Sequence, residues 1–542
     1  MPADVTAAAE APRKTVAEQL DALFAPWNRT DEPGFTVGIA KDGQVIYRRG
    51  FGMASLETSV ANTPSTRMRV GSISKHFTCL LALLLAEDGK LDLDAPIRTY
   101  VEELAGSGGD PTLRQLMHHR GGSRCYLDIG FIGHGMNVPP LGRALAVQAR
   151  QTGRNFAPGE AMIYNNGGYH LLSIAIERVG GAPFEELLKT RLFDVVGMPD
   201  TASVPTDHRI TPGIAAMHLP SHGGWRRGLF PSDEVRGEGA IVSTVDDMLR
   251  WTAHLRSRDR FGSAQTWAAL TEAPVYADGS RGNYGLGLMA DRHRGLPVVH
   301  HSGGVIGGTA QMLTFPEHGV EIVILANGGR DANVVELADK AADIVLADRV
   351  GPETPKIPAD EFKGALGDYW SPETHAVYSL ADEKGSLTLA LAKGLVGAPL
   401  QRGEDGWLIC PGGGIGEIRV RPDGEDLEVR FGLGKHLYRR LTPAGGDAEA
   451  FAAAAAGRYY SEDADTTAVI AQEGEALTLD LSDGYGRVVA PLNPLSPLVA
   501  FSTPKGQMMV FRTTITLDLA GGRAIGFDLN TARTRNLAFR RV

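Results

Sequence analysis

The stretch RVGSISKHFTCLLALLLAE, residues 69–87, contains the most apolar segment of the chain and, directly before it, a reactive pair of side chains. The apolar part, residues 77–86, suits a buried helix, and it is too short to span a bilayer because charged residues follow from Glu87. At the N-terminus of such a helix, Ser72 and Lys75 lie one turn apart on the same face. The stretch therefore predicts a buried helix with a serine and a lysine side by side at its start.

The spacing of Ser72 and Lys75 suits a nucleophile and its base. A serine hydroxyl needs a base to attack a carbonyl, and a lysine that is desolvated can act as one. Free backbone N–H groups and the positive end of the helix dipole surround a hydroxyl at this position. The same four-residue pattern occurs about once by chance in a chain of this length. We interpret Ser72 as the candidate nucleophile and Lys75 as its candidate base, to be weighed with other motifs.

A second motif, Tyr164-Asn165-Asn166, follows the turn-forming residues 156–159 and precedes a predicted helix. A tyrosine held beside the ammonium of Lys75 would lose its proton more easily and could exchange protons with a substrate. Asn166 could orient a substrate amide. The alternative is a half-buried tyrosine with a satisfied hydroxyl and an asparagine that makes a turn.

A third motif, His301-Ser302-Gly303-Gly304, follows a short predicted strand ending at Val299. Glycines allow a backbone to approach a ligand closely. The N–H of Gly304, with that of Ser72, would then form an oxyanion hole, while His301 would add a hydrogen bond or a positive charge facing the substrate. The alternative is a surface histidine beside a flexible turn.

The pattern around these motifs predicts an α+β unit over residues 1–347. Residues 35–52 alternate apolar segments with turn signals, which is typical of a hairpin with its tip at Lys41-Asp42-Gly43. Strands at both ends of the unit with helices between them predict one antiparallel sheet, flanked by helices and closed by both ends. The other expected elements are helices over 169–179 and 245–255 and strands over 298–299 and 311–326.

The sequence changes character near residue 348, where a polar, proline-containing stretch predicts a linker over 348–360. Beyond it the sequence repeats: Gly367-Asp368-Tyr369-Trp370-Ser371 recurs as Gly457-Arg458-Tyr459-Tyr460-Ser461. Such a repeat predicts two copies of one all-β module, and many short strands are typical of small barrels. We expect two antiparallel β-barrel domains, at 361–445 and 450–542.

Composition excludes several classes of partner. The chain has 542 residues, a formal charge of -10 and an isoelectric point near 5.9. It therefore lacks a basic footprint for nucleic acid or an anionic membrane, and we expect neither partner. The first residues show no apolar core after a basic end, so we expect no export signal and a cytoplasmic location.

The residues that most often bind metals or cofactors are placed without a recognisable pattern. The three cysteines, Cys79, Cys125 and Cys410, are widely spaced and are expected to be free thiols. The adjacent pairs His118-His119 and His300-His301 lack the spacing of metal ligands. The glycine-rich run 412–416 lacks the strand–helix context of a phosphate-binding loop. We expect no metal and no cofactor.

Taken together, the three motifs resemble those of the serine β-lactamase and penicillin-binding-protein superfamily, in its class C-like branch. His301-Ser302-Gly303 is similar to the histidine form of its K-T-G element. The resemblance covers roughly residues 30–345 and implies an acyl-enzyme mechanism, in which Ser72 attacks, and Lys75 and Tyr164 take and return its proton. Further similar phrases are Gly89-Lys90-Leu91-Asp92-Leu93-Asp94, Thr112-Leu113-Arg114-Gln115-Leu116, Ser243-Thr244 and Tyr284-Gly285-Leu286-Gly287.

A catalytic unit followed by two related β modules resembles the architecture of bacterial D-aminopeptidases. The resemblance implies release of N-terminal D-amino acids from small peptides and amides or esters, with β-lactams as inhibitors; a homodimer is an expected assembly. It also implies that a loop of the last barrel reaches the site, which we place at residues 482–487. There Asp483 would pair with the substrate ammonium; the alternative is a solvated hairpin tip.

Other functions share the same residues. An esterase, a D-peptide carboxypeptidase or a β-lactamase-like hydrolase on this fold would use the same Ser72, Lys75, Tyr164 and His301. A non-enzymatic alternative is an idle pocket that binds a D-peptide or a β-lactam. Covalent labelling by a β-lactam would distinguish an enzyme from the idle pocket.

Overall fold

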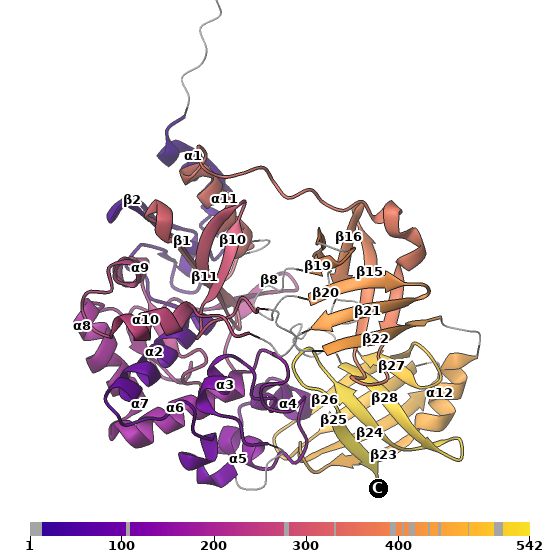
Figure 1. Ribbon diagram of the computed structural model, residues 1–542. Coiled ribbons are helices and arrows are strands. Elements are labelled where there is room, and N and C mark those ends of the chain that lie inside the picture. Colours follow the sequence, from indigo (N-terminus) through magenta and orange to yellow (C-terminus); the bar gives the residue numbers. More distant parts are fainter. Residues whose placement is uncertain are drawn as a thin grey trace, which may run out of the picture.

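The computed structural model describes residues 14–104, 109–275, 281–329, 332–390, 397–403, 406–410, 418–431, 434–442, 446–474, 476–502 and 513–542. Figure 1 shows an α+β unit on the left and two β units, in orange and yellow, stacked on the right. After α11 (Val334–Val345) the chain crosses at the top of the picture, in an extended segment, to η7 (Ala359–Ala365) at the first β unit.

A six-stranded antiparallel sheet forms the centre of the α+β unit, in the order β10-β11-β12-β13-β1-β2. β1 (Phe35–Lys41) and β2 (Gln44–Phe51) form the hairpin predicted for residues 35–52. β13 (Val320–Ala326) pairs along the whole of β1, which confirms that strands from both ends of the unit meet in one sheet. The other strands of this sheet are β10 (Met289–His293), β11 (Leu296–Val305) and β12 (Gly308–Phe315).

Helices cover both faces of this sheet. The helices expected over 169–179 and 245–255 are confirmed as α6 and α9. The helices in chain order up to α10 are α1 (Val16–Phe24), α2 (Ser74–Glu87), α3 (Leu113–Met117), α4 (Tyr126–His134), α5 (Arg143–Ala149), α6 (Asn166–Gly180), α7 (Phe184–Leu188), α8 (Asp194–Val196), α9 (Val245–Ser257) and α10 (Ala264–Thr271).

Alternate side chains along β13 pack against different helices on the two faces of the sheet. Ile322 and Ile324 point to one face, where they pack in a cluster with α1 and α11. Val323 and Leu325 point to the other face and join a larger core with α2, α6 and α9. Successive strand residues face opposite sides, so a strand covered on both sides is buried throughout. α2, the predicted apolar helix, thus lies at the centre of the unit.

Two β sheets follow, and only the second is a closed barrel. The first has nine strands in the order β17-β16-β15-β14-β22-β21-β20-β19-β18. Leu400 alone separates its edge strands β17 and β18, so the sheet curls into a near-barrel, although no ladder joins these two strands within the described ranges. The second sheet runs from β23 to β30 in chain order and closes. This agrees with the expected pair of small antiparallel β modules.

The strands of the first module are β14 (Gly367–Trp370), β15 (Val377–Glu383), β16 (Ser386–Ala390), β17 (Ala398–Pro399), β18 (Gln401–Arg402), β19 (Leu408–Cys410), β20 (Ile418–Asp423), β21 (Asp426–Phe431) and β22 (Gly434–Leu441). Those of the barrel are β23 (Gly457–Ser461), β24 (Thr466–Glu473), β25 (Ala476–Ser482), β26 (Arg487–Pro494), β27 (Val499–Ser502), β28 (Thr513–Ala520), β29 (Arg523–Asn530) and β30 (Leu537–Arg541). Between the modules, α12 (Asp447–Ala455) is a helix that we did not predict; its alanines favour one.

The two β modules repeat in their hydrogen bonds as well as in sequence. Tyr369 Oη donates to the carbonyl oxygen four residues earlier at 2.6 Å, and Tyr459 Oη does the same at the same distance. Arg440 lies over the ring of Tyr369 as Arg541 lies over that of Tyr459. In each module the last strand pairs with the first. The predicted internal repeat is therefore confirmed.

The closed barrel shares a hydrophobic core with the α+β unit. Ile129 and Phe131 of α4 belong to the same buried cluster as Leu479 and Phe527 of the barrel. A second contact is electrostatic: Arg124, directly before α4, pairs with Asp463 through Nη1 and Oδ2 at 2.6 Å, with side-chain exposures of 3% and 12%. Barrel and α4 are thus joined by apolar packing and by a buried ion pair.

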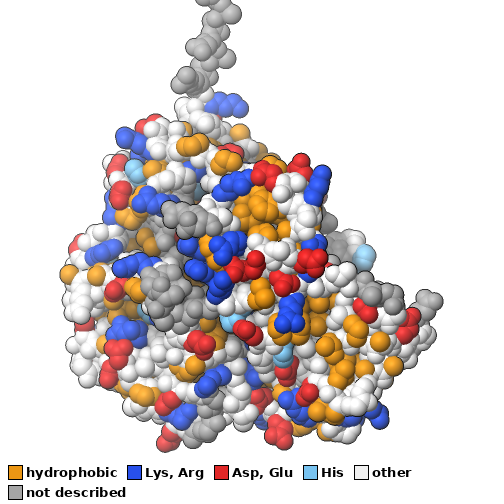
Figure 2. All heavy atoms as spheres, turned by 45° about the vertical axis from the view of Figure 1, so that its right-hand side comes forward, with side chains coloured by type: hydrophobic (Ala, Val, Ile, Leu, Met, Phe, Trp, Pro, Cys, Tyr) orange, Lys and Arg blue, Asp and Glu red, His pale blue; other side chains and the backbone are white. Residues whose placement is uncertain are grey.

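Three further features of the described chain concern its surface charge, its cysteines and the length of its apolar helices. On the face drawn in Figure 2, acidic and basic side chains are interspersed. The three cysteines are buried and free, as predicted. No helix in the described ranges is long and apolar enough to cross a membrane.

Removing the charge of Asp463 from its buried pair with Arg124 should cause a large loss of stability. Asp463→Asn leaves the Arg124 guanidinium buried without its counter-charge, and we expect the free energy of unfolding to fall by about 3–5 kcal/mol in denaturant titrations. As a control, Asp480→Asn removes a partner from the pair with Arg487, whose side chain is 66% exposed, and should cost less than about 1 kcal/mol. Equal small losses in both variants would contradict the role of the buried pair.

Candidate active site

Ser72 lies in a tight turn at the entrance to α2. The 3-10 turn η2 (Gly71–Ile73) leads directly into α2, which begins at Ser74, slightly earlier than the predicted start near His76. Lys75 then lies in the first turn of α2, and its Nζ is 3.1 Å from Ser72 Oγ. The structure therefore brings the predicted pair into direct contact at the N-terminal end of a buried helix.

Lys75 is fully buried and has three polar neighbours. Its Nζ donates to Asn166 Oδ1 at 2.8 Å and to the carbonyl oxygen of Glu238 at 2.7 Å, in addition to the contact with Ser72. Burial lowers the pKa of Lys75 to about 7; the Glu238 carboxyl opposes this and the charge of Arg533 adds to it. Two of the neighbours can only accept, whereas the Ser72 hydroxyl can also donate. A neutral amine can thus keep both donated bonds and accept the serine proton.

Tyr164 lies beside this amine, but its pKa moves opposite to our expectation. Lys75 Nζ is 4.8 Å from the centre of the Tyr164 ring. Burial raises the pKa of Tyr164 above its ordinary value, against a smaller lowering by Ser72. The Tyr164 hydroxyl is buried and has no well-formed hydrogen bond to any described residue. Desolvation outweighs the neighbouring charge, so Tyr164 is a neutral phenol with a free donor and Lys75 is the stronger candidate base.

Glycines let β11 approach the Ser72 turn. β10 pairs with β11 only as far as His300, so the edge of β11 beyond that point faces η2. A Cβ on Gly303 would lie 1.9 Å from Val70 O, and one on Gly71 would lie 2.8 Å from Gly304 N. Side chains at Gly71 or Gly303 would therefore push the two segments apart. The close approach places the backbone nitrogen of Gly304 beside η2.

His301 is buried and neutral, which corrects the expectation of a positive charge. It lies within β11, which continues past Val299 to Val305. His301 Nδ1 is 2.6 Å from the carbonyl oxygen of Ser302, so we assign the proton to Nδ1, and Nε2 then accepts from Tyr284 Oη at 3.1 Å. Burial, followed by the charge of Lys75, lowers the pKa of His301 to about 3. With both nitrogens bound by the protein, the ring positions Tyr284.

A cavity opens beside Ser72, with about 420 Å³ of empty space that includes its solvent-filled mouth. Asn166, the first residue of α6, points its Oδ1 at Lys75, which leaves its Nδ2 available to a ligand. The cavity is lined by Ser72, Leu127, Asn166, Phe230, Glu238 and Gly304, among others. The structure thus gathers a hydroxyl with its base, an amide donor and the Gly304 backbone around one space, as an acyl-transfer site requires.

Comparison with known proteins places this site in a family. A family model described as Beta-lactamase matches residues 13–346, more than half of the chain. The chain belongs to the beta-lactamase family. Among curated relatives, a D-aminopeptidase of Cereibacter sphaeroides is 29% identical over 532 residues, which cover 96% of this chain and 98% of the relative. A D-aminopeptidase of Brucella ovis is 27% identical and covers 65% of this chain and 66% of its own length.

Solved structures with a similar fold include a penicillin-binding protein homologue and a D-amino acid amidase. An octameric penicillin-binding protein homologue from Pyrococcus abyssi is 24% identical, with a TM-score of 0.56, over 78% of this chain and 99% of its own. A D-amino acid amidase from Ochrobactrum anthropi SV3 is 22% identical, with a TM-score of 0.52, over 62% of this chain and 98% of its own. At these identities the likeness shows a shared fold.

Sequence reasoning missed residues that hold this beta-lactamase-family site together. Glu238 binds Lys75 through its carbonyl oxygen, and its carboxyl accepts a hydrogen bond from Tyr126 on α4. His119 Nδ1 accepts the Asn165 N–H at 3.0 Å and so fixes the segment that contains Tyr164. Glu238 stands between two glycines, the one local signal of an unusual backbone. Nothing in the sequence around His119 indicated this contact.

Asp483 lies outside the Ser72 cavity. Its Oδ2 is 2.7 Å from His134 Nδ1 on α4, and its Oδ1 accepts the N–H groups of Tyr485 and Gly486 at 2.7 and 3.1 Å. The Asp483 side chain is only 2% exposed. This corrects the expectation that Asp483 receives a substrate ammonium, because both carboxylate oxygens are used in holding the β25–β26 turn against α4.

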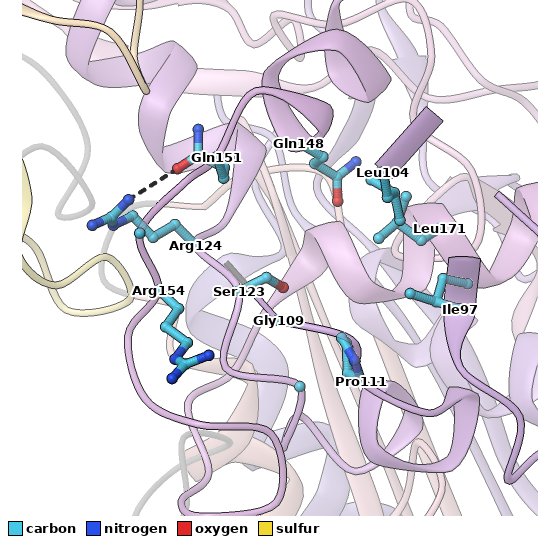
Figure 3. A pocket seen from close by; sticks show the side chains of 12 residues that line it. Ile97, Leu104, Gly109, Pro111, Ser123, Arg124, Gln148, Gln151, Arg154 and Leu171 are labelled. Atoms are coloured by element: carbon cyan, nitrogen blue, oxygen red, sulfur yellow. Dashed lines mark hydrogen bonds between the residues drawn. The ribbon is translucent and has the colours of Figure 1, made fainter. Parts of the chain in front are cut away.

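A second cavity, of about 460 Å³, lies away from Ser72 (Figure 3). Ile97, Leu104 and Leu171 form its apolar side, and Arg124 and Gln151 lie at its other end, joined by a hydrogen bond of 3.2 Å. Arg124 is also committed to the barrel through Asp463. None of the described residues that line this cavity is a predicted site residue, so the Ser72 cavity is the candidate active site.

The close approach of β11 predicts different effects for two neighbouring glycines. Gly303→Ala should slow covalent labelling of Ser72 by a fluorophosphonate on the order of a hundredfold, because a shift of about 1 Å in a reacting group costs that much. A Cβ on Gly304 meets no atom within 4 Å, so Gly304→Ala should lose far less. Similar labelling rates in the two variants, with both folded by circular dichroism, would show that the contact does not position Ser72.

Proposed function

We propose that this protein is a serine hydrolase that releases N-terminal D-amino acids from small peptides and amides through an acyl-enzyme on Ser72. The observation that carries the proposal is the buried amine of Lys75, in contact with the Ser72 hydroxyl and with a pKa near neutrality. The D-aminopeptidases related to this chain over nearly its whole length support the substrate class.

Acylation begins with Lys75 in its neutral form. Its Nζ takes the proton of Ser72 Oγ as this oxygen attacks the carbonyl carbon of the substrate. The negative charge that develops on the carbonyl oxygen is stabilised by the backbone N–H groups of Ser72 and Gly304, which the packing of β11 on η2 brings together. Asn166 Nδ2 donates to the acyl part in the adjoining cavity.

Collapse of the tetrahedral intermediate requires a proton on the leaving amine. Tyr164 is a neutral phenol with a free donor, so it gives its proton to the leaving nitrogen and regains one from the Lys75 ammonium. Water then attacks the acyl-enzyme, again with Lys75 as base, and its proton returns to Ser72 Oγ as the acid is released. The cycle balances, with one water consumed for each bond cleaved. His301 acts by positioning Tyr284.

The lowered pKa of Lys75 predicts the pH dependence of the reaction. Only the neutral amine can accept the serine proton, so kcat/KM should fall about tenfold for each pH unit below about 7 and level off above it. Lys75→Arg keeps a cation that cannot lose its proton and should abolish turnover at every pH tested. A rate independent of pH between 5 and 8 would contradict Lys75 as the base.

Substrate class is tested with four chromogenic compounds: D-alanine p-nitroanilide, its L-isomer, its N-acetylated form and p-nitrophenyl acetate. We expect hydrolysis of the free-amine D-anilide and the ester, and loss of both in Ser72→Ala with the fold intact. Hydrolysis of the ester alone would make the protein an esterase, and activity close to wild type in Ser72→Ala would exclude the mechanism. Covalent labelling of Ser72 by a β-lactam would exclude an idle binding pocket.

A further inference from the structure

The loop between β29 and β30, residues 531–536, extends from the closed barrel to the Ser72 site. Thr531 Oγ1 donates to Asp128 Oδ2 on α4 at 2.8 Å, and Asn155 Nδ2 donates to the carbonyl oxygen of Arg533 at 2.9 Å. Arg124 adds two hydrogen bonds to carbonyl oxygens of the same loop. The loop is therefore fixed in place by side chains of the catalytic unit.

Arg533, in the middle of this loop, places its guanidinium over the catalytic tyrosine. Its Cζ lies 5.1 Å from the centre of the Tyr164 ring, at cation–π distance. Lys75 Nζ lies 4.8 Å from the same centre. Within the described part of the chain, no carboxylate pairs with the Arg533 guanidinium and no acceptor hydrogen-bonds to it. A half-buried cation without a partner thus stands next to the reacting groups.

Asp128, whose pKa the charge of Arg533 lowers, does not form an ion pair with this cation. Asp128 uses Oδ2 for Thr531, and its Oδ1 has no partner among the described residues. Burial raises the pKa of Asp128, and the charge of Arg533 opposes that rise from beyond ion-pair distance. An arginine left without a counter-charge at a partly desolvated site favours binding of an anion from solution. A guanidinium offers a planar fork that matches a carboxylate.

We infer that Arg533 binds the carboxylate of the leaving amino acid, so that the preferred substrates are short peptides that end one residue after the scissile bond. The inference rests on the proposed function. In that mechanism Tyr164 hands its proton to the leaving nitrogen, so the leaving group lies on the Tyr164 side of Ser72. The α-carboxylate of a leaving amino acid is two bonds from this nitrogen. The guanidinium over the Tyr164 ring is therefore placed where this carboxylate can reach it.

The test compares D-alanylglycine with D-alanylglycinamide, which differ only in the terminal carboxylate, by the D-alanine released. We expect wild-type protein to have a higher kcat/KM for the acid than for the amide. In Arg533→Gln the ratio of these two values should fall about tenfold to hundredfold, the loss expected for a charge-assisted, bidentate contact. Arg533→Lys, which keeps the charge and loses the fork, should fall between the two. Arg458→Gln, at an exposed position of β23, removes the same charge and should leave the ratio unchanged.

Binding gives a second readout that does not depend on turnover. In Ser72→Ala protein, D-alanylglycine should bind by calorimetry, and adding Arg533→Gln should weaken it about tenfold or more. Equal losses on acid and amide in Arg533→Gln, with a shifted pH profile, would overturn the inference and make Arg533 a positioning residue for Lys75 and Tyr164. Hydrolysis of D-alanine p-nitroanilide with a preference for the dipeptide amide would overturn it while the proposed function stands. Failure on every D-substrate would overturn both.

Discussion

Complete burial of the Lys75 amine is the constraint on which the rest of the site depends. A charged ammonium is costly to bury, and the pKa of Lys75 falls because the protein replaces water with only a few polar partners. Those partners, Ser72, Asn166 and the Glu238 carbonyl, come from η2, the start of α6 and the segment before β9 (Ile241–Ser243). Three distant parts of the chain therefore set both the position and the proton affinity of one nitrogen. The packing that buries Lys75 therefore also determines its ability to act as a base.

The same desolvation assigns the charges of the neighbouring groups. It raises the pKa of Tyr164 and lowers that of His301, so both are neutral near pH 7 and are suited to donating and accepting hydrogen bonds. Two neighbouring groups act on the pKa of Lys75 in opposite directions: the buried Glu238 carboxyl raises it, and the guanidinium of Arg533 lowers it. Lys75 and the guanidinium of Arg533 both lie within cation–π distance of the Tyr164 ring, so this ring is a neighbour that they share.

What the sequence could predict was local. The hairpin at 35–52 and the apolar helix with Ser72 and Lys75 each depend on residues within a few positions of one another, and the β modules were recognised from short motifs that recur along the chain. The helix α12 was missed although its alanines are a local signal, because the stretch lies at the boundary between the two predicted modules. The pKa direction of Tyr164 was missed for another reason: it depends on burial of the phenol, and neighbours of its ring such as His119 and Arg533 are far away in sequence.

The barrel loop shows the limit of local reasoning most clearly. The turn at Asp483 had a recognisable Asp-Gly pattern, yet its carboxylate is used by His134. The loop that does reach Tyr164, residues 531–536, has no such pattern, and its place follows from contacts made by Arg124, Asn155 and Asp128.

These contacts also decide what kind of element the loop is. α4 shares a core with the barrel, and its residue Leu127 lines the Ser72 cavity, so barrel, helix and cavity form one packed body. The loop is held by several hydrogen bonds, two of them from Arg124, which is itself fixed by the buried ion pair with Asp463, so it is a fixed wall and not a lid that closes over substrate. The guanidinium of Arg533 would then bind a carboxylate from a position that is set before the substrate arrives. Little free energy is lost in ordering the loop when the substrate binds. Substrate length would then be limited by the shape of the barrel edge, which makes the β module part of the specificity of the site.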